Sequence, residues 1–424
     1  MNQLKLSLFL SSCFFSVSVL GQIQSNSIPL EEAYRWAEQH YPLIKDSDLI
    51  DKIEAINLNN IGKTGLPKIS LNGQGQLQSE NINIPIGDNA INAPLETFSA
   101  YVGIDYDLYD GGIKKAQKAS EIASANVERK SLEVQLRSLK DRVNTIVFVI
   151  ALSRKQKQIL QTSKEDLEVN IQSLQAGFEN GTVLESEVTK LMVRQLELTS
   201  EIIKTEGDIR TYVSLLEQLT GKTFPEDVQF ELPYVVPTFQ AEAINRPEEL
   251  LFDNQKSLFA AQEASIAAST RPKISLFAQG GVGYPNPLDF SDISTATYAL
   301  GGVKLKWDFL DWGKGKKERE RIKLQQEQIE VDRELFLFDL DSDRLEYQED
   351  MAALQVQIKN DEAIVSMQKD ILTQSKVQLD NGVINSNDYV TQVNATLNAE
   401  QQLEFNKIQL QQTIINYLTL IGQL

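Results

Sequence analysis

The sequence of 424 residues contains one cysteine, Cys13, and one histidine, His40. Cys13 lies in an N-terminal segment that we expect to be removed, so the mature chain is predicted to lack disulfides, thiolate zinc sites and a cysteine nucleophile. His40 has no second histidine or cysteine to share a metal with, and neither a metal site nor a Ser-His-Asp triad is predicted. We therefore expect no enzyme, with no catalytic residues, no metal and no cofactor.

Positive charge is also scarce. The chain has 41 lysine and arginine residues against 59 aspartate and glutamate residues, and its formal net charge is −18. It lacks the basic surface that binds phosphates of nucleic acids, so no nucleic-acid partner is expected. The run Gly313-Lys314-Gly315-Lys316-Lys317 lacks the spacer and the final Ser or Thr of a phosphate-binding loop. We interpret it as the basic start of a helix.

Long apolar runs are confined to the first residues. Residues 1–21 contain Lys5, an apolar run from Leu6 to Leu20 and small residues before Gln22, which is the pattern of a secretory signal peptide. A lipoprotein signal ending at Cys13 is the alternative, but the apolar run continues beyond this residue. No other window holds 18 consecutive apolar residues, so no transmembrane helix is predicted.

Four segments alternate between apolar and other residues and are predicted to be strands. They span 68–78, 98–110, 273–284 and 297–310, and their polar faces carry Gln74, Gln76, Asp105, Asp107 and Lys304. Strands of about ten residues with aromatic residues at their ends are typical of an outer-membrane barrel. The predicted membrane-interface aromatics are Tyr106, Tyr109, Trp307, Phe309 and Trp312. A four-stranded soluble sheet is the alternative.

Between these strands the sequence predicts long helices. Residues 113–176 contain no proline or glycine, and apolar residues recur at spacings of three and four, as in a coiled coil. At about 1.5 Å per residue this helix would reach about 96 Å. The other predicted helices are a short helix 30–62, a return helix 185–220, and a second short, long and return helix at 247–270, 314–380 and 386–422.

The same order of elements occurs twice. Asp107 and Asp308 lie 201 residues apart, and so do the turns Asn180-Gly181 and Asn381-Gly382. Such self-similarity is the sign of a duplicated unit. We divide the chain into a first repeat 22–221, a linker or equatorial segment 222–245 and a second repeat 246–424.

Four strands alone would leave unpaired backbone edges in a membrane, where each unsatisfied group costs several kcal/mol. Copies of the chain would therefore have to share one barrel. Two copies would give eight strands and a filled interior, whereas three would give twelve strands and room for a lumen. The polar strand faces suit a wet interior, so we expect three copies.

In its order of elements the mature chain resembles the TolC family of trimeric outer-membrane efflux ducts. The family's opening pattern is similar to Leu30, Ala33, Ala37 and His40-Tyr41-Pro42-Leu43, and to Asn245-Arg246-Pro247-Glu248-Glu249-Leu250 in the second copy. The resemblance implies a mainly α protein with transmembrane β structure. Its trimeric twelve-stranded outer-membrane β-barrel, four strands per chain, would be continued by a long periplasmic α-helical barrel, with internal duplication.

The resemblance also implies partners and sites. A homotrimer in outer-membrane lipid would dock a periplasmic adaptor and, through it, an inner-membrane pump of the RND, ABC or MFS type. The docking turns would be Asn180, Gly181, Asn381 and Gly382, and the periplasmic constriction would hold Glu185, Glu187, Asp388 and Tyr389. Where the family often has Asp-Val-Leu-Asp, this chain has Asp388-Tyr389-Val390-Thr391, so it lacks the second acid.

We therefore expect a passive exit duct of a tripartite efflux or type I secretion system, located in the outer membrane of a Gram-negative bacterium and extending into the periplasm. A non-conducting coiled-coil scaffold that spans the periplasm is one alternative. A secreted hydrolase that uses carboxylates is another, and it would need a few acids clustered in a concave site.

Overall fold

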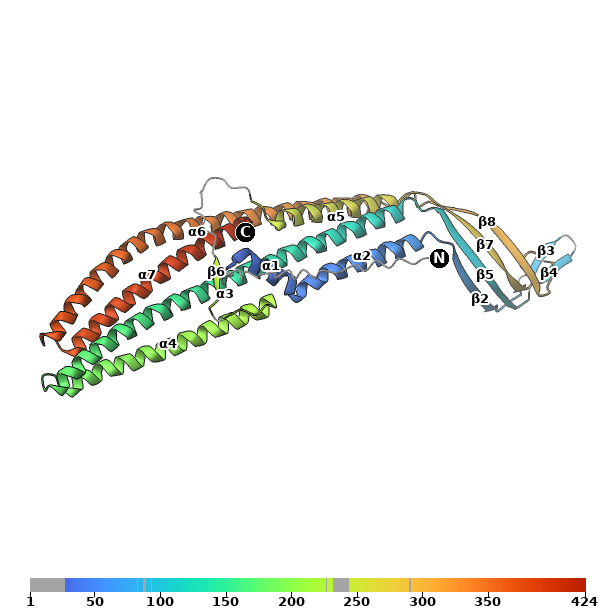
Figure 1. Ribbon diagram of the computed structural model, residues 1–424. Helices are drawn as coiled ribbons and strands as arrows, with labels where there is room; N and C mark the ends of the chain where they lie inside the picture. The colour runs from blue at the N-terminus through green and yellow to red at the C-terminus, as the bar shows by residue number, and fades with distance from the viewer. Residues whose placement is uncertain are drawn as a thin grey trace, which may run out of the picture.

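The structure is a computed structural model that describes residues 27–81, 83–86, 89–92, 94–225, 227–231, 244–289 and 291–424. The predicted signal peptide, residues 1–21, lies outside the described residues, as do positions 226 and 232–243 of the segment 222–245. The chain is elongated, with a bundle of long helices at one end and a tilted sheet at the other (Figure 1).

Seven α-helices form the long part of the described chain. The longest are α3 (Ile113–Glu179) and α6 (Lys314–Asp380), each of 67 residues, and each is followed by a 36-residue return helix, α4 (Glu185–Thr220) or α7 (Ser386–Ile421). The shorter helices α1 (Leu30–His40), α2 (Lys45–Lys63) and α5 (Pro247–Ser269) continue the layer toward the sheet. As a result, short helices lie beside the sheet-proximal halves of α3 and α6, and the return helices lie beside the other halves (Figure 1).

The predicted short helix 30–62 is wrong as a single element, because the structure divides it. Helix α1 ends at His40, Tyr41 is extended with a ψ of 131°, and a 3-10 turn, η1 (Pro42–Ile44), precedes α2. A residue before proline is disfavoured in the helical region, and proline has no N–H to donate. Pro247 does not break α5, because it occupies the first turn, where that N–H is not needed.

The sheet contains β2 (Lys68–Leu77), β5 (Glu96–Tyr109), β7 (Lys273–Tyr284) and β8 (Ala296–Lys306), in that order and all antiparallel. One cross-strand row is Leu71, Val102, Gly280 and Ala299. Directly paired residues share a face of a sheet. The register therefore collects the apolar residues on one face, among them Ile69, Leu71, Val102, Ile104, Tyr106, Ile274, Leu276, Val282, Val303 and Leu305.

The last strand is shorter than predicted. Strand β8 ends at Lys306, whereas the sequence predicts a strand over 297–310, so Trp307 and Phe309 follow the strand instead of ending it. The reason is that β7, the only partner of β8 within the described chain, begins at Lys273, which pairs with Lys306. The alternation of apolar and polar residues within one strand does not predict where its partner strand ends.

Four small strands have no counterpart in the predicted order. Strands β3 (Asn83–Ile86) and β4 (Asn89–Asn92) form a hairpin between β2 and β5, where the sequence predicts no strand. Strand β1 (Ser27–Pro29) pairs in parallel with β6 (Gln229–Glu231), which lies in the predicted linker 222–245. Part of this linker is thus held against β1, where the described part of the chain begins.

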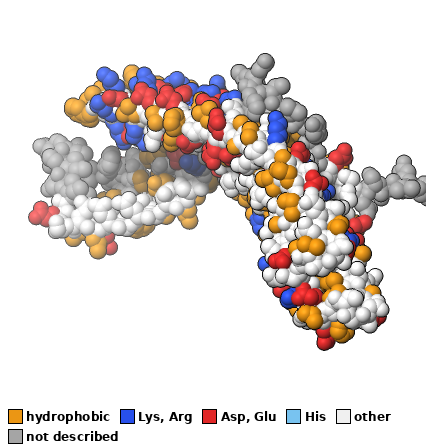
Figure 2. Space-filling view, turned by 90° about the vertical axis from the view of Figure 1, so that its left-hand side faces the viewer, with side chains coloured by type: hydrophobic (Ala, Val, Ile, Leu, Met, Phe, Trp, Pro, Cys, Tyr) orange, Lys and Arg blue, Asp and Glu red, His pale blue; other side chains and the backbone are white. Residues whose placement is uncertain are grey.

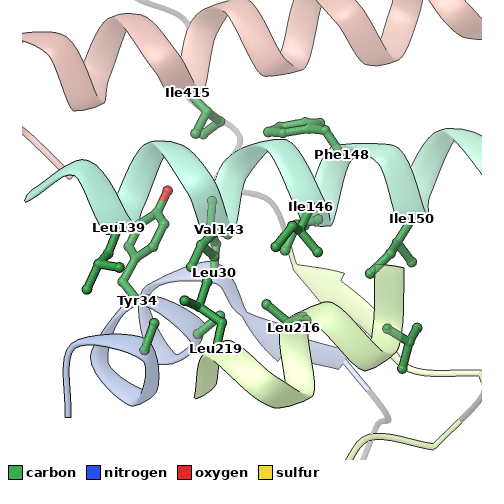
Figure 3. Close-up of a cluster of buried hydrophobic side chains, with 14 of the residues drawn as sticks. Leu30, Tyr34, Leu139, Val143, Ile146, Phe148, Ile150, Leu216, Leu219 and Ile415 are labelled. Carbon is green, nitrogen blue, oxygen red and sulfur yellow. The ribbon is translucent and has the colours of Figure 1, made fainter. Parts of the chain in front are cut away.

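The core lies within the helical part. Leu30 and Tyr34 of α1, residues of α3 from Leu139 to Ile150, Leu216 and Leu219 of α4, and Ile415 of α7 form one buried cluster, in which α3 lies between the other helices (Figure 3). Two further clusters join α3, α4, α6 and α7 toward the tips and α6 to α7 near the chain end. In the described chain, none of the three clusters contains a residue of the four-stranded sheet.

Candidate functional site

The apolar face of the sheet is uncovered. Leu71 is 82% exposed and Leu305 is 67% exposed, although both lie on the face that carries most of the aliphatic strand residues. Removing apolar surface from water contributes about 25 cal/mol per Å², and a large exposed apolar patch marks a surface for another molecule or a membrane. This face has the chemistry of a lipid contact.

The opposite face carries the polar residues that the sequence predicts for it. Gln74 pairs with Ser99, and Asp107 and Lys304 both pair with Ser275. Phe277 lies on this face as well, because it pairs with Asp105, and so do Tyr101 and Tyr298, which both pair with Gly281. The face is therefore mixed, and the sequence reasoning, which followed the polar positions of this face, did not place Phe277 on it.

Two turns convert strands into long helices at the rim of the sheet. The carboxylate of Asp110 accepts hydrogen bonds from the backbone N–H groups of Gly112 and Lys114, both at 2.8 Å. Asp311 does the same for Gly313 at 2.9 Å and Gly315 at 2.8 Å. Each aspartate thereby satisfies N–H groups that the first helical turn leaves unpaired. The sequence signal was an aspartate two residues before a glycine at the end of each strand.

These contacts change the pKa of both aspartates. Burial by itself raises the pKa of the Asp110 carboxyl, but the N–H groups of Lys114 and Gly112 together hold it below its ordinary value. The N–H groups of Gly315 and Gly313 lower the pKa of Asp311. Both groups therefore remain charged caps well into the acidic range.

All five predicted membrane-interface aromatics lie at the rim end of the sheet. Tyr106 and Tyr109 belong to the end of β5, and Trp307, Phe309 and Trp312 lie between β8 and α6. Trp307 donates its indole N–H to the carbonyl oxygen of Thr270 at 3.2 Å, and its ring lies 6.1 Å from that of Phe309. These residues thus end β5 or lie between β8 and α6, and Figure 1 shows that the sheet meets the helices there.

The two helical tips reverse the chain with the same turn. Asn180 and Asn381 each donate a side-chain N–H to a carbonyl oxygen in the last turn of the long helix, at 2.8 and 2.7 Å. Gly181 and Gly382 follow with φ of 76° and 67°, a region that favours glycine. A Cβ on either glycine would meet nothing within 4 Å, so both turns are open to a partner.

Glu187 links the two tips. Its carboxylate accepts a 2.7 Å hydrogen bond from the backbone N–H of Ser386, the first residue of α7, and a 2.8 Å bond from Lys190. The bond from Lys190 is the largest cause of a lowered pKa for Glu187, and the Ser386 N–H adds to it. This side chain is thus engaged between α4 and α7 instead of standing free.

The remaining residues of the predicted constriction divide into two kinds. Glu185 and Asp388 are exposed, and neither has an ion-pair partner in the described part of the chain. Tyr389 is only 3% exposed, and its hydroxyl accepts a 2.6 Å hydrogen bond from Asn170 of α3. Burial raises the pKa of Tyr389 to about 12. In this conformation Tyr389 belongs to the core of the tip and does not line an opening, contrary to its predicted position.

The described residues contain no helix that is both long and apolar enough to cross a membrane. They also contain no group of three or more His, Cys, Asp or Glu side chains suited to hold a metal ion.

No protein-family model matches the sequence, and no curated protein matches it. The fold, however, is that of solved outer-membrane channels. The outer membrane protein VceC of Vibrio cholerae is 13% identical, with a TM-score of 0.66 over 93% of this chain and 96% of its own. The CmeC outer membrane channel of Campylobacter jejuni is 15% identical, with a TM-score of 0.64 over 94% of this chain and 86% of its own. The MtrE outer membrane channel of Neisseria gonorrhoeae is 14% identical, with a TM-score of 0.61 over 93% of this chain and 88% of its own. Of the fold expected from the resemblance, the mainly α chain with the fold of these outer-membrane channels is confirmed.

Proposed function

We propose that this chain is one copy of a homotrimeric channel in the outer membrane of a Gram-negative bacterium, and that the channel is the passive exit duct of a tripartite efflux or type I secretion system. One observation carries the proposal: a sheet with an uncovered apolar face continues, through two capped turns, into helices of 67 residues. The shared fold of solved outer-membrane channels supports it.

The edges of the sheet support three copies. Strands β2 and β8 each pair with one strand, so each leaves one edge without a partner in the described chain. Such edges are not tolerated in lipid, where backbone groups must be satisfied by closure. If β8 of one copy pairs with β2 of the next, three copies give a twelve-stranded barrel with a lumen lined by the mixed face.

The sides of the helical layer also support association of copies. Helix α6 presents Leu324, Val331, Phe338 and Leu345, which are all exposed and spaced by seven residues. On the other side of the layer, α2 and α4 expose apolar residues, namely Leu49, Ile53, Ile56, Met192, Leu196 and Ile203. Figure 2 shows exposed hydrophobic side chains among charged ones on the helical part. Heptad spacing is the pattern of helices that pack against helices.

We assign adaptor docking to the turns Asn180-Gly181 and Asn381-Gly382, because their surfaces are exposed and free of contacts around the glycines. The adaptor would connect the duct to an inner-membrane pump of the RND, ABC or MFS type. Exposed Glu185 and Asp388 would stand near the entrance, where carboxylates shape ion entry.

The test combines mass and conductance. Purified protein in detergent is expected to have the mass of three chains and to conduct in planar bilayers. An intact trimer with no current under any voltage or salt condition would favour the non-conducting scaffold. A monomer that stays soluble without detergent would overturn the membrane assignment.

A matched pair of variants tests the lipid-facing assignment. Leu71→Arg charges the apolar face, whereas Gln74→Arg charges the opposite face of the same strand. A lipid-facing arginine near the bilayer midplane costs about 2–4 kcal/mol. We expect Leu71→Arg to reduce insertion strongly and Gln74→Arg to leave insertion intact while changing ion selectivity. Equal insertion of the two variants would contradict the assignment.

A further inference from the structure

The two rim turns have the same local geometry. Asp110 and Asp311 make equivalent caps. The glycines two residues later, Gly112 and Gly313, have φ of 89° and 80°. Between each aspartate and its glycine lies one residue, Gly111 with a φ of 75° or Trp312 with a φ of 55°. The turns differ in that middle residue and in what lies against it.

The first turn is covered by the connection between α5 and β7. A Cβ on Gly111 would lie 3.0 Å from the carbonyl oxygen of Ala268 and 3.2 Å from the Cβ of Arg271. Arg271 also donates a guanidinium N–H to the carbonyl oxygen of Gly111 at 3.5 Å. Any side chain at position 111 would have to displace this backbone.

The second turn is uncovered. Trp312 is 88% exposed, and a Cβ on Gly313 would meet nothing within 4 Å. Trp312 is also the one non-glycine residue with positive φ in the described part of the chain. A bulky residue in this region is strained and persists only where its surroundings hold it. A contact that holds Trp312 is missing from a single copy.

The sequence repeat identifies the missing contact. Pro67–Leu71 in the first repeat has the same sequence as Pro272–Leu276 in the second. In this alignment Leu66 is equivalent to Arg271, and Lys63 is equivalent to Ala268. Leu66 is 60% exposed and precedes β2, the free edge opposite β8. We propose that Trp312 of each copy packs on Leu66 of the next copy, at the rim where the sheet becomes helical. This inference rests on the proposed ring of copies.

Chemistry and size both favour this pair. The contact within one chain joins a glycine to an arginine, whereas the contact between copies would join two large apolar side chains that are exposed in the single chain. The approach of 3.0 Å at Gly111 leaves no room for an indole ring. The seam between copies must therefore be wider at this level than the seam within a chain, and Trp312 would fill it.

Cysteine crosslinking of the mature chain, which is predicted to lack Cys13, tests the pair. Leu66→Cys with Trp312→Cys, treated with a short bifunctional thiol reagent, is expected to give covalent dimers and trimers, and each single variant is expected to give none. The matched control is Leu49→Cys with Trp312→Cys, since Leu49 is a similarly exposed leucine farther along the same side. Protein that has the mass of a trimer but forms no crosslink between positions 66 and 312 would overturn the inference without contradicting the proposed function. Absence of any trimer would overturn both.

Trp312→Gly adds a second measurement. Relief of backbone strain alone would raise the temperature at which the trimer dissociates in detergent, because glycine suits a positive φ. Loss of the contact with Leu66 would lower that temperature, and we expect the lower value. Leu66→Ala should lower it as well, and should have little further effect in the Trp312→Gly background. A higher or unchanged temperature for Trp312→Gly would overturn the inference.

Discussion

The carboxylate of Glu187 lies 2.7 Å from the backbone nitrogen of Ser386, a residue 199 positions later in the chain. Through this bond a side chain in the first turn of α4 satisfies an N–H group at the start of α7. The two tips of the molecule are therefore one connected structure.

Removing this carboxylate should loosen the second tip. Glu187→Ala leaves the Ser386 N–H without its acceptor, at a cost of about 1–3 kcal/mol for a bond to a charged group. We expect amide exchange at Ser386 to accelerate by about five- to 150-fold, since 1.4 kcal/mol corresponds to a factor of ten. Glu185→Ala, which changes an exposed acid in the same turn, is the control. Unchanged exchange at Ser386 would contradict the role of this bond.

The same bond should depend on pH. The pKa of Glu187 is lowered in the folded chain, mainly by Lys190 and then by Ser386. The charged carboxylate therefore stabilises the fold fully above the unfolded pKa of about 4.3, and this stabilisation is lost as the pH falls through the folded pKa. The difference in stability between the parent protein and the Glu187→Ala variant should therefore be constant around neutral pH and disappear in strong acid. A difference that persists at the lowest pH would count against a charged acceptor.

The cap at the first rim turn can be tested by replacing Asp110. Asp110→Ala should weaken the first turn of α3 by about 1 kcal/mol, whereas Asn, which retains an acceptor, should cost less. Because the pKa of Asp110 is lowered in the folded chain, the stabilisation should fade as the pH falls below about 4. Amide exchange at Gly112 and Lys114 is the measurement. Equal exchange in the Ala and Asn variants would exclude capping.

A buried polar contact joins three helices in the middle of the molecule. Asn144 is fully buried, accepts a hydrogen bond from the Tyr34 hydroxyl, and donates to Thr419 at 3.3 Å. Tyr34→Phe should lower stability by about 1–3 kcal/mol, because Asn144 then keeps an unsatisfied buried acceptor. Thermal unfolding followed by circular dichroism measures this, with Tyr212→Phe at the edge of the same cluster as control. Equal midpoints for the two variants would refute the prediction.

Two glycines of opposite conformation give a matched pair. Gly181→Ala forces an alanine into a positive φ, which costs about 1 kcal/mol even though the added methyl group has open space. Gly207→Ala adds a methyl group in equally open space inside α4, where alanine is favoured by about 0.5–1 kcal/mol. The two changes should therefore shift the unfolding midpoint in opposite directions. Shifts of the same sign would show that the tip turn is not held at positive φ.

Asp388 tests the constriction. In the proposed ring of three copies, Asp388→Asn would neutralise three exposed carboxylates together, and we expect selectivity for cations over anions to fall on the order of twofold. The reversal potential in a salt gradient measures the preference. Asp380→Asn, which changes the last residue of α6, is a control for a general change of tip charge. Unchanged selectivity, conductance and gating in Asp388→Asn would remove this residue from the entrance.

The sequence by itself determined the long helices, the four main strands and the faces of those strands. Alternation placed the aliphatic residues of the four strands on one side, and the absence of proline and glycine over 113–176 predicted a helix that the structure extends over Ile113–Glu179. The turn glycines Gly181 and Gly382 were found because positive φ is a local requirement of the backbone. All of these features depend on residues a few positions apart.

Only the tertiary structure decided which partners the elements meet. Strand β8 ends at Lys306 because β7 begins at Lys273, Tyr389 is buried because Asn170 and its neighbours on α3 cover it, and Glu187 is occupied because the start of α7 lies beside it. Strands β1 and β6 lie about two hundred residues apart in the sequence, and no sequence pattern predicts that they pair. Burial and pairing are properties of two surfaces at once, and the sequence of one segment specifies only one of them.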